Sequence, residues 1–265
     1  LMKATLGIVL AIASAATACG AGGGSGPESV TSIYVDAAAG SDAGGDGSSG
    51  SPYRTVGRGL AAAKAGATVK IRAGLYGDGE TLPLKVPAEV TLSGVIATTG
   101  SSELVGSGAY WSPVLASTVS VSIVTGAGSR LASLRVRAPG AIAVLCEESG
   151  APAHLIGNEL VGSGYGAVVA GLATTELTSN LVSGNASIGI DAVGDSAPVL
   201  RRNEVTSNLV GVAIGDRALP DLGTASAPGE NTIAANTDCD VANETSNVIQ
   251  ARGNTWDLNA FLFSA

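Results

Sequence analysis

An asparagine recurs about every 23 residues through the second half of the chain, and this repeat constrains the fold more than any other feature. Similar short segments surround successive asparagines, as in residues 154–161, 176–183 and 199–206. The recurring residues are Asn158, Asn180, Asn203, Asn231 and Asn254, at spacings of 22, 23, 28 and 23 residues. A chain with such a period is built from stacked units, each of which needs its neighbours for stability.

Each repeat contains a short strand, an asparagine turn and a second short strand. Strands this short cannot bury an apolar face alone, whereas coils stacked about 4.8 Å apart bury aliphatic side chains inside a solenoid. Asparagine tolerates the left-handed backbone of tight turns, and stacked amides also bond to one another along the axis. The sequence therefore predicts an all-β, single-stranded parallel β-helix of about nine coils over residues 32–265.

Both ends of such a solenoid expose strand edges that need a cover. Near the N-terminus, Val56, Leu60 and Ala63 recur at helical spacing before Gly66, which predicts a capping α-helix near residues 55–65. At the other end, apolar and aromatic residues such as Trp256 concentrate in residues 254–265, which we interpret as a C-terminal cap. The longest spacing of the repeat predicts a loop over residues 217–229.

The first residues have the pattern of an export signal. A basic start at Lys3 precedes a short apolar stretch, which predicts a signal peptide over residues 1–18. Residues 16–20 resemble a bacterial lipobox, so we expect lipidation of Cys19 followed by a Gly/Ser-rich tether over residues 19–31. The expected location is the outer membrane or cell surface, with the lipid as the only membrane contact. The alternative is ordinary cleavage and secretion.

Charge and composition exclude several classes of function. The net charge of −8 argues against a nucleic-acid partner. One histidine and three cysteines leave little material for a transition-metal site. Cys146 and Cys239 would lie about four rungs apart, roughly 19 Å, which is too far for a disulfide. We therefore expect two buried free thiols. We also expect the protein to be a monomer.

Several motifs match a known group of proteins. An opening motif includes residues 34–36 and 51–55, and later motifs include residues 220–223 and 253–256. With its opening motif the chain resembles pectate-lyase-like β-helix proteins, including polysaccharide lyase family nine. With the later motifs it resembles, more narrowly, the family catalogued as domain of unknown function 1565. The resemblance spans roughly residues 32–258 and implies a right-handed parallel β-helix, an exported bacterial protein and a carbohydrate partner. That family has no established reaction. The matching segments are residues 34–36, 40–42, 51–55, 60–69, 73–76, 79–84, 90–94, 220–223 and 253–256.

Two sets of charged residues are candidates for catalysis. Asp191, Asp195 and Asp216 fall near the second strands of successive coils and predict an acidic patch, as a glycoside hydrolase would need. Arg135 and Arg137 share one strand face, and with the nearby Glu147 and Glu148 they suggest a uronate or sulfate site. The alternative for both sets is a solvated surface with ion pairs.

Two further segments are weaker candidates for binding. Tyr110 and Trp111 form a mid-chain aromatic pair in an expected loop, which would either present a sugar-binding platform or cover an apolar seam. Asp36, Asp42 and Asp46 lie in a Gly-rich segment whose oxygens suit Ca²⁺, although plain turns explain the glycines equally well. No other cofactor is predicted.

No recognisable acid–base set emerges from these residues. We therefore expect a non-catalytic protein that binds a polysaccharide or envelope glycan, or that builds the envelope. One alternative is a polysaccharide lyase or glycoside hydrolase that acts on an acidic polysaccharide. Another is an adhesin-like structural spacer.

Overall fold

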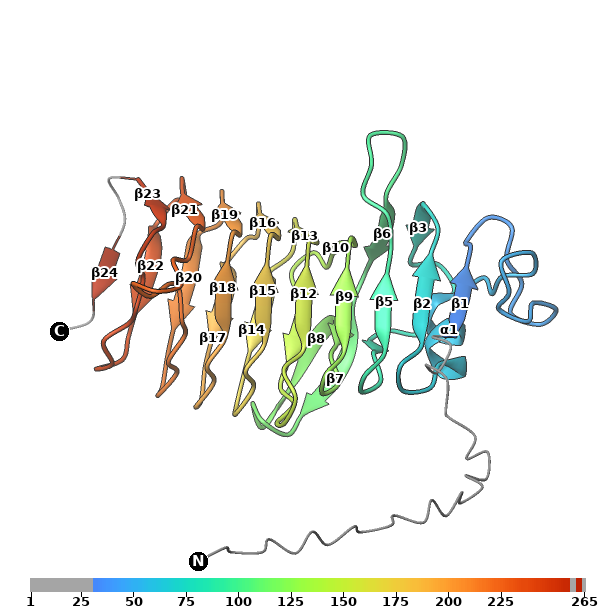
Figure 1. The fold of residues 1–265 in the computed structure, drawn as a ribbon, viewed down its shortest axis with the longest axis horizontal. Helices are drawn as coiled ribbons and strands as arrows, with labels where there is room; N and C mark the ends of the chain where they lie inside the picture. Colours follow the sequence, from blue (N-terminus) through green and yellow to red (C-terminus); the bar gives the residue numbers. More distant parts are fainter. Residues whose placement is uncertain (1–30, 258–260, 264–265) are drawn as a thin grey trace, which may run out of the picture.

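Three parallel sheets run side by side along an elongated solenoid (Figure 1). The computed structural model describes residues 31–257 and the backbone of residues 261–263. Each turn of the chain contributes one strand to each sheet, and strands of successive turns pair in parallel. This arrangement confirms the predicted parallel β-helix.

Successive coils give each sheet its order. The first sheet contains β1 (Ser32–Val35), β2 (Thr68–Ile71), β5 (Thr91–Ser93), β9 (Arg130–Ala132), β12 (His154–Ile156), β15 (Glu176–Thr178) and β18 (Val199–Arg201). The second contains β3 (Gly74–Tyr76), β6 (Ser102–Val105), β10 (Arg135–Arg137), β13 (Glu159–Val161), β16 (Leu181–Ser183), β19 (Glu204–Thr206), β21 (Thr232–Ala234) and β23 (Thr255–Trp256). The third contains β4 (Leu84–Lys85), β8 (Ser117–Val124), β11 (Ile142–Cys146), β14 (Tyr165–Val169), β17 (Ile188–Ala192), β20 (Val210–Ile214), β22 (Cys239–Asn243) and β24 (Phe261–Phe263). Strand β7 (Gly108–Ser112) pairs antiparallel with β8.

The segment 217–229 is only partly a loop. Asp221 bridges to Val199 on one side and to Gln250 on the other, so both residues extend the first sheet. Seven strands and these two bridge positions make nine rungs among the described residues, in agreement with the predicted coil number.

The interior is a stack of equivalent side chains, one from each rung. In the first sheet Leu131, Leu155, Leu177 and Leu200 are partners in register, and each is fully buried. Period-two alternation directs them inward and their sequence neighbours outward. Stacked leucines of one shape fill the core at each coil, which is why the repeat length is nearly constant.

An amide ladder runs beside this core. The Nδ2 atom of Asn158 donates to Oδ1 of Asn180 at 3.0 Å, and Asn180 bonds Asn203 in the same way. The expected left-handed backbone does not belong to these asparagines. It belongs to the residue before each, such as Ser179 and Arg202, both with φ of 56°. The asparagine must point inward to accept the backbone N–H of the previous coil, so the preceding residue makes the turn.

The N-terminal end is closed by α1 (Val56–Ala62). Val56 and Leu60 are buried against the first coils, and the Oγ1 atom of Thr55 accepts the Arg58 N–H at 3.2 Å as an N-cap. The helix lies within the expected range 55–65 but ends at Ala62, four residues before Gly66.

At the C-terminal end, β23 and the backbone of β24 continue the second and third sheets. The expected cap over residues 254–265 therefore includes further rungs of the solenoid. Its apolar residue Leu258, and the last two residues of the chain, lie outside the described residues.

Both internal thiols are buried and free, as predicted: Cys146 on β11 and Cys239 on β22. In the third sheet β14, β17 and β20 lie between β11 and β22, so the two cysteines are four rungs apart. This separation is too large for a disulfide. Within the described residues, no helix has the length and apolar character needed to cross a bilayer.

Candidate functional site

The outward face of the third sheet is unusually apolar. Its in-register column contains Val124, Leu145, Val168, Asp191 and Ala213 on β8, β11, β14, β17 and β20. The first three residues belong to a second apolar cluster, separate from the interior core. An outward column is normally solvated, so these buried aliphatic side chains need a cover outside the coil.

A β-hairpin supplies that cover. Strands β7 and β8 pair antiparallel, and Tyr110 packs on the outer cluster with its hydroxyl donating to Glu147 Oε1 at 2.5 Å. The Ser112 hydroxyl donates to the other oxygen of the same carboxylate, which is buried. Two hydrogen bonds to one ionisable group therefore hold the hairpin against the third sheet.

The hairpin corrects the expectation for the aromatic pair. Tyr110 and Trp111 lie on a strand rather than in a loop, and adjacent strand residues point to opposite faces. Tyr110 accordingly covers the apolar seam, whereas the Trp111 side chain is 61% exposed. The two residues do not form one platform.

The hairpin tip forms one wall of a groove. Val114 at the tip meets the turn after β14, where a Cβ on Gly171 would lie only 2.7 Å from Val114 Cγ1. Gly171 also has a φ of +67°, so both the turn and the close approach require glycine. The tip is thus seated directly on the rim of the third sheet.

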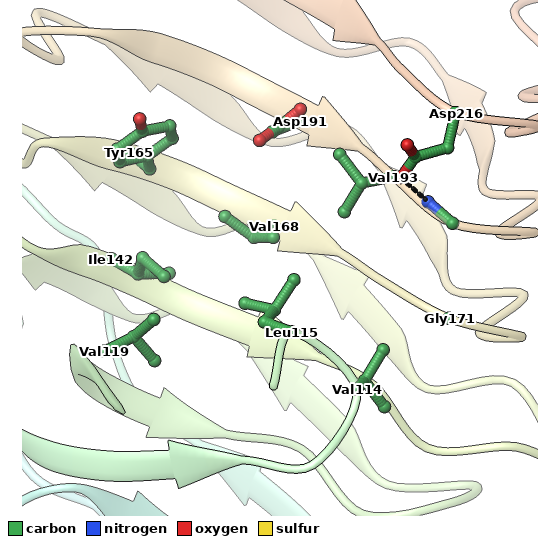
Figure 2. A pocket seen from close by; sticks show the side chains of 11 residues that line it. Val114, Leu115, Val119, Ile142, Tyr165, Val168, Gly171, Asp191, Val193 and Asp216 are labelled. Atoms are coloured by element: carbon green, nitrogen blue, oxygen red, sulfur yellow. Dashed lines mark hydrogen bonds between the residues drawn. The ribbon is translucent and has the colours of Figure 1, made fainter. Parts of the chain in front are cut away.

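Beyond this wall lies a groove of about 450 Å³ that opens to solvent (Figure 2). Its surface is mainly aliphatic, with one tyrosine and two carboxylates. The lining residues are Val114, Leu115, Val119, Ile142, Tyr165, Val168, Gly171, Asp191, Val193, Gly194 and Asp216. A concave apolar surface with a few polar groups is the usual form of a ligand site.

Asp191 is the exceptional residue of this groove. It is half-buried on β17 between Val168 and Ala213, and among the described residues its carboxylate makes neither a hydrogen bond nor an ion pair. Burial, together with the negative charges of Glu244 and Asp216, raises its pKa to about 6. A perturbed carboxyl group in an apolar groove marks a candidate functional site.

The three predicted acids separate in the structure. Asp216 follows β20 with a φ of 54°, lines the groove with Asp191, and accepts the Gly194 N–H at 2.9 Å. Asp195 instead forms a two-pronged ion pair with Arg217, with both N···O distances at 2.6 Å. Asp195 is therefore not a lining residue, and the acidic site has two members.

The predicted arginine site does not form. Arg135 and Arg137 lie on β10 in the second sheet, where Arg135 pairs with Glu159 at 2.5 Å and Arg137 with Glu103 at 3.4 Å. Both carboxylates come from the strands next to β10: Glu159 is the in-register partner of Arg135, whereas Arg137 reaches Glu103 diagonally. Glu147, expected opposite the arginines, binds the hairpin on the third sheet instead.

The three acids proposed for Ca²⁺ are also apart. Asp36 accepts the N–H groups of Ala38 and Ala39 at 2.9 and 3.0 Å, while Asp42 and Asp46 accept backbone N–H groups elsewhere in the same segment. These carboxylates build turns, and the backbone bond from Ala39 is the main cause that lowers the pKa of Asp36. Within residues 31–257, no three metal-ligating side chains cluster.

Sequence reasoning found Asp191 and Asp216 but missed the groove that surrounds them. The missing part is the hairpin, whose signal is the alternating segment before Ser112-Pro113, a turn sequence that separates two strands without an intervening coil. Tyr165, Val168 and Val193 were unremarkable as solenoid residues. Only the fold shows that their outward side chains meet.

Comparisons with known proteins identify a family and similar folds. A family model described as "Protein of unknown function (DUF1565)" matches residues 38–260. Among solved structures, the pectate lyase Pel9A has a TM-score of 0.51 at 11% identity, covering 88% of this chain and 77% of that one. A pectin methylesterase from Aspergillus niger has a TM-score of 0.48 at 16% identity, covering 90% and 84%. No curated protein matches. At this low identity, the likeness to the pectate lyase supports the β-helix fold alone.

Proposed function

The chain belongs to the DUF1565 family, whose description assigns no function, and from the site itself we propose that it is a non-catalytic glycan-binding protein of the bacterial surface. The groove on the third sheet is the proposed binding site. The observation that carries this proposal is Asp191, a half-buried carboxylate in an apolar groove that has no hydrogen-bond or ion-pair partner among the described residues.

Such a carboxylate lowers the stability of the fold, which favours a role outside folding. Sugars combine apolar C–H faces with hydroxyl donors, and this groove combines Tyr165 and aliphatic side chains with two acceptors, Asp191 and Asp216. A lyase needs a basic group near the uronate, and the described lining residues include no lysine or arginine.

One observation favours a second candidate, a glycoside hydrolase. Asp191 has a pKa of about 6 and lies in the same groove as Asp216. Asp216 accepts the Gly194 N–H, whereas no hydrogen bond to Asp191 is found among the described residues. Glycoside hydrolysis uses two carboxyl groups in one groove, and the raised pKa of Asp191 suits the general acid.

Binding and turnover measured together test the proposal. The full-length chain is mixed with a panel of polysaccharides, and affinity, new reducing ends and unsaturated products are recorded. Val193→Trp fills the groove and should weaken binding at least about tenfold, whereas Ser183→Trp on the second sheet is the matched control. New reducing ends that require Asp191 would replace this function by hydrolysis, and unimpaired binding by Val193→Trp would place the site elsewhere.

We also propose that the protein is exported and lipid-anchored through Cys19. The N-terminal signal pattern and the Gly/Ser-rich tether support this location. Membrane fractionation of a Cys19→Ser variant measures it.

A further inference from the structure

The charge of the groove indicates which sugars it accepts. Resting on the proposed glycan-binding function, we propose that the groove selects a sugar unit with a protonated amine, whose ammonium group contacts Asp191 and Asp216. The ligand class is therefore a cationic amino sugar, and not the acidic polysaccharide of the alternative enzymatic interpretation.

Among the residues that the structure describes, no ion pair neutralises the groove carboxylates, and the charge of Asp216 acts on Arg217 only at longer range. Neither Asp191 nor Asp216 takes part in an ion pair among the described residues. The nearest candidate, Arg217, is held by Asp195 through two bonds. Lys85 lies in the same outward column as Asp191 but four rungs away, roughly 19 Å, with its Nζ atom over the Tyr110 ring.

The resulting potential discriminates by charge. Glu244 adds a third negative charge that acts on Asp191. A uronate carboxylate in this groove would face like charges at close range. An ammonium group would form charge-assisted hydrogen bonds with Asp191, and with Asp216, whose hydrogen-bond partner is the backbone N–H of Gly194 rather than a cation. The groove thus repels the ligands typical of an acidic-polysaccharide site and attracts an amine.

The apolar lining accounts for the sugar part of the ligand. Val168 and Val193 lie beside Asp191, and Tyr165 presents its ring from the neighbouring strand (Figure 2). These side chains suit the C–H face of a pyranose, and they place it next to the carboxylates. A small hydrated cation would gain nothing from this apolar surface.

Calorimetry with two matched ligands tests the inference. The full-length chain is titrated with glucosamine oligomers and with N-acetylglucosamine oligomers of the same length. We expect the amine form to bind about tenfold to a hundredfold more tightly, as hydrogen bonds to charged groups allow. Asp191→Asn should reduce that preference to about twofold or less, while Asp238→Asn, which removes an exposed charge from the turn before β22, should preserve it.

The outcomes separate the two proposals. Equal affinity for both oligomers, or tighter binding of oligogalacturonate, overturns the amine preference and leaves glycan binding intact. Failure of every carbohydrate to bind overturns both. Circular dichroism of each variant shows that a lost preference is not caused by a lost fold.

Discussion

At the residue scale, one aspartate illustrates how a candidate site residue can lower the stability of the fold that holds it. Asp191 occupies an outward column whose neighbours are aliphatic, and its burial favours the neutral form. Asp195 lies in the turn directly after β17 and pairs with Arg217. The same type of side chain forms an ordinary surface ion pair there. Environment rather than residue type therefore distinguishes the candidate site residue.

The raised pKa of Asp191 predicts a pH-dependent penalty on stability. Well below pH 4 the group is protonated in both states. As the pH rises from about 4 to about 6 the penalty on the folded state grows, and above that range it reaches about 3 kcal/mol. Asp191→Asn should therefore raise the free energy of unfolding by about 2–3 kcal/mol near pH 7.5 and change it little near pH 3.5.

Urea unfolding at both pH values measures this difference. Asp238→Asn is the control, because its exposed carboxylate should leave the free energy of unfolding nearly unchanged at either pH. The explanation fails if Asp191→Asn has the same effect at both pH values.

At the element scale, the asparagine ladder joins successive turns into one structure. Each buried amide accepts the backbone N–H of the previous coil and donates to a backbone carbonyl, as Asn180 does for Asn158 and Leu155. These groups have no water to bond in the interior, so the ladder satisfies donors and acceptors that the turn would otherwise leave unpaired.

Asn180→Ala should destabilise the protein by about 3–5 kcal/mol, because the Asn158 N–H and the Leu155 carbonyl each lose a buried hydrogen bond and the Asn158 side-chain amide loses one of its two. Asn254→Ala, at the partly exposed last rung, should cost about half as much because water can replace the lost bonds. The midpoints of urea unfolding compare the two variants. Equal losses would show that the ladder does not depend on burial.

At the scale of the whole molecule, α1 and the hairpin cover two different surfaces of the solenoid. The helix covers the N-terminal end of the solenoid, where β1 would otherwise expose apolar side chains and an open edge. The hairpin covers only part of the third sheet, and the uncovered part is the groove. Residues 19–31 lead into β1, so a lipid on Cys19 would attach the solenoid by its capped end.

Replacing Cys19 by Ser should move most of the protein from the membrane fraction to the soluble fraction, because in the proposed arrangement the lipid on Cys19 is the whole anchor. Ser25→Ala, within the same tether, should leave the distribution unchanged. Immunoblots of the membrane and soluble fractions measure the distribution of each variant. Retention of the Cys19 variant in membranes would exclude a lipid on this residue.

The sequence alone determined the solenoid. A near-constant spacing of asparagines, with one inward leucine or valine for each strand, encodes stacking because every coil repeats the same local pattern. The number of coils and the free thiols follow from that period, and the short capping helix follows from the helical spacing of Val56 and Leu60; all agree with the structure.

Tertiary structure decided which outward side chains meet. Arg135 pairs with Glu159 and Asp195 with Arg217 because coil register sets the neighbours across rungs, and register depends on turn lengths that differ between coils. The groove required a hairpin that leaves the solenoid and folds back over three later strands. Asp191 and Asp216 are recognisable in the sequence as acids, but only this folding back places them in an apolar groove, because a period describes the interior of a solenoid and not its outer surface.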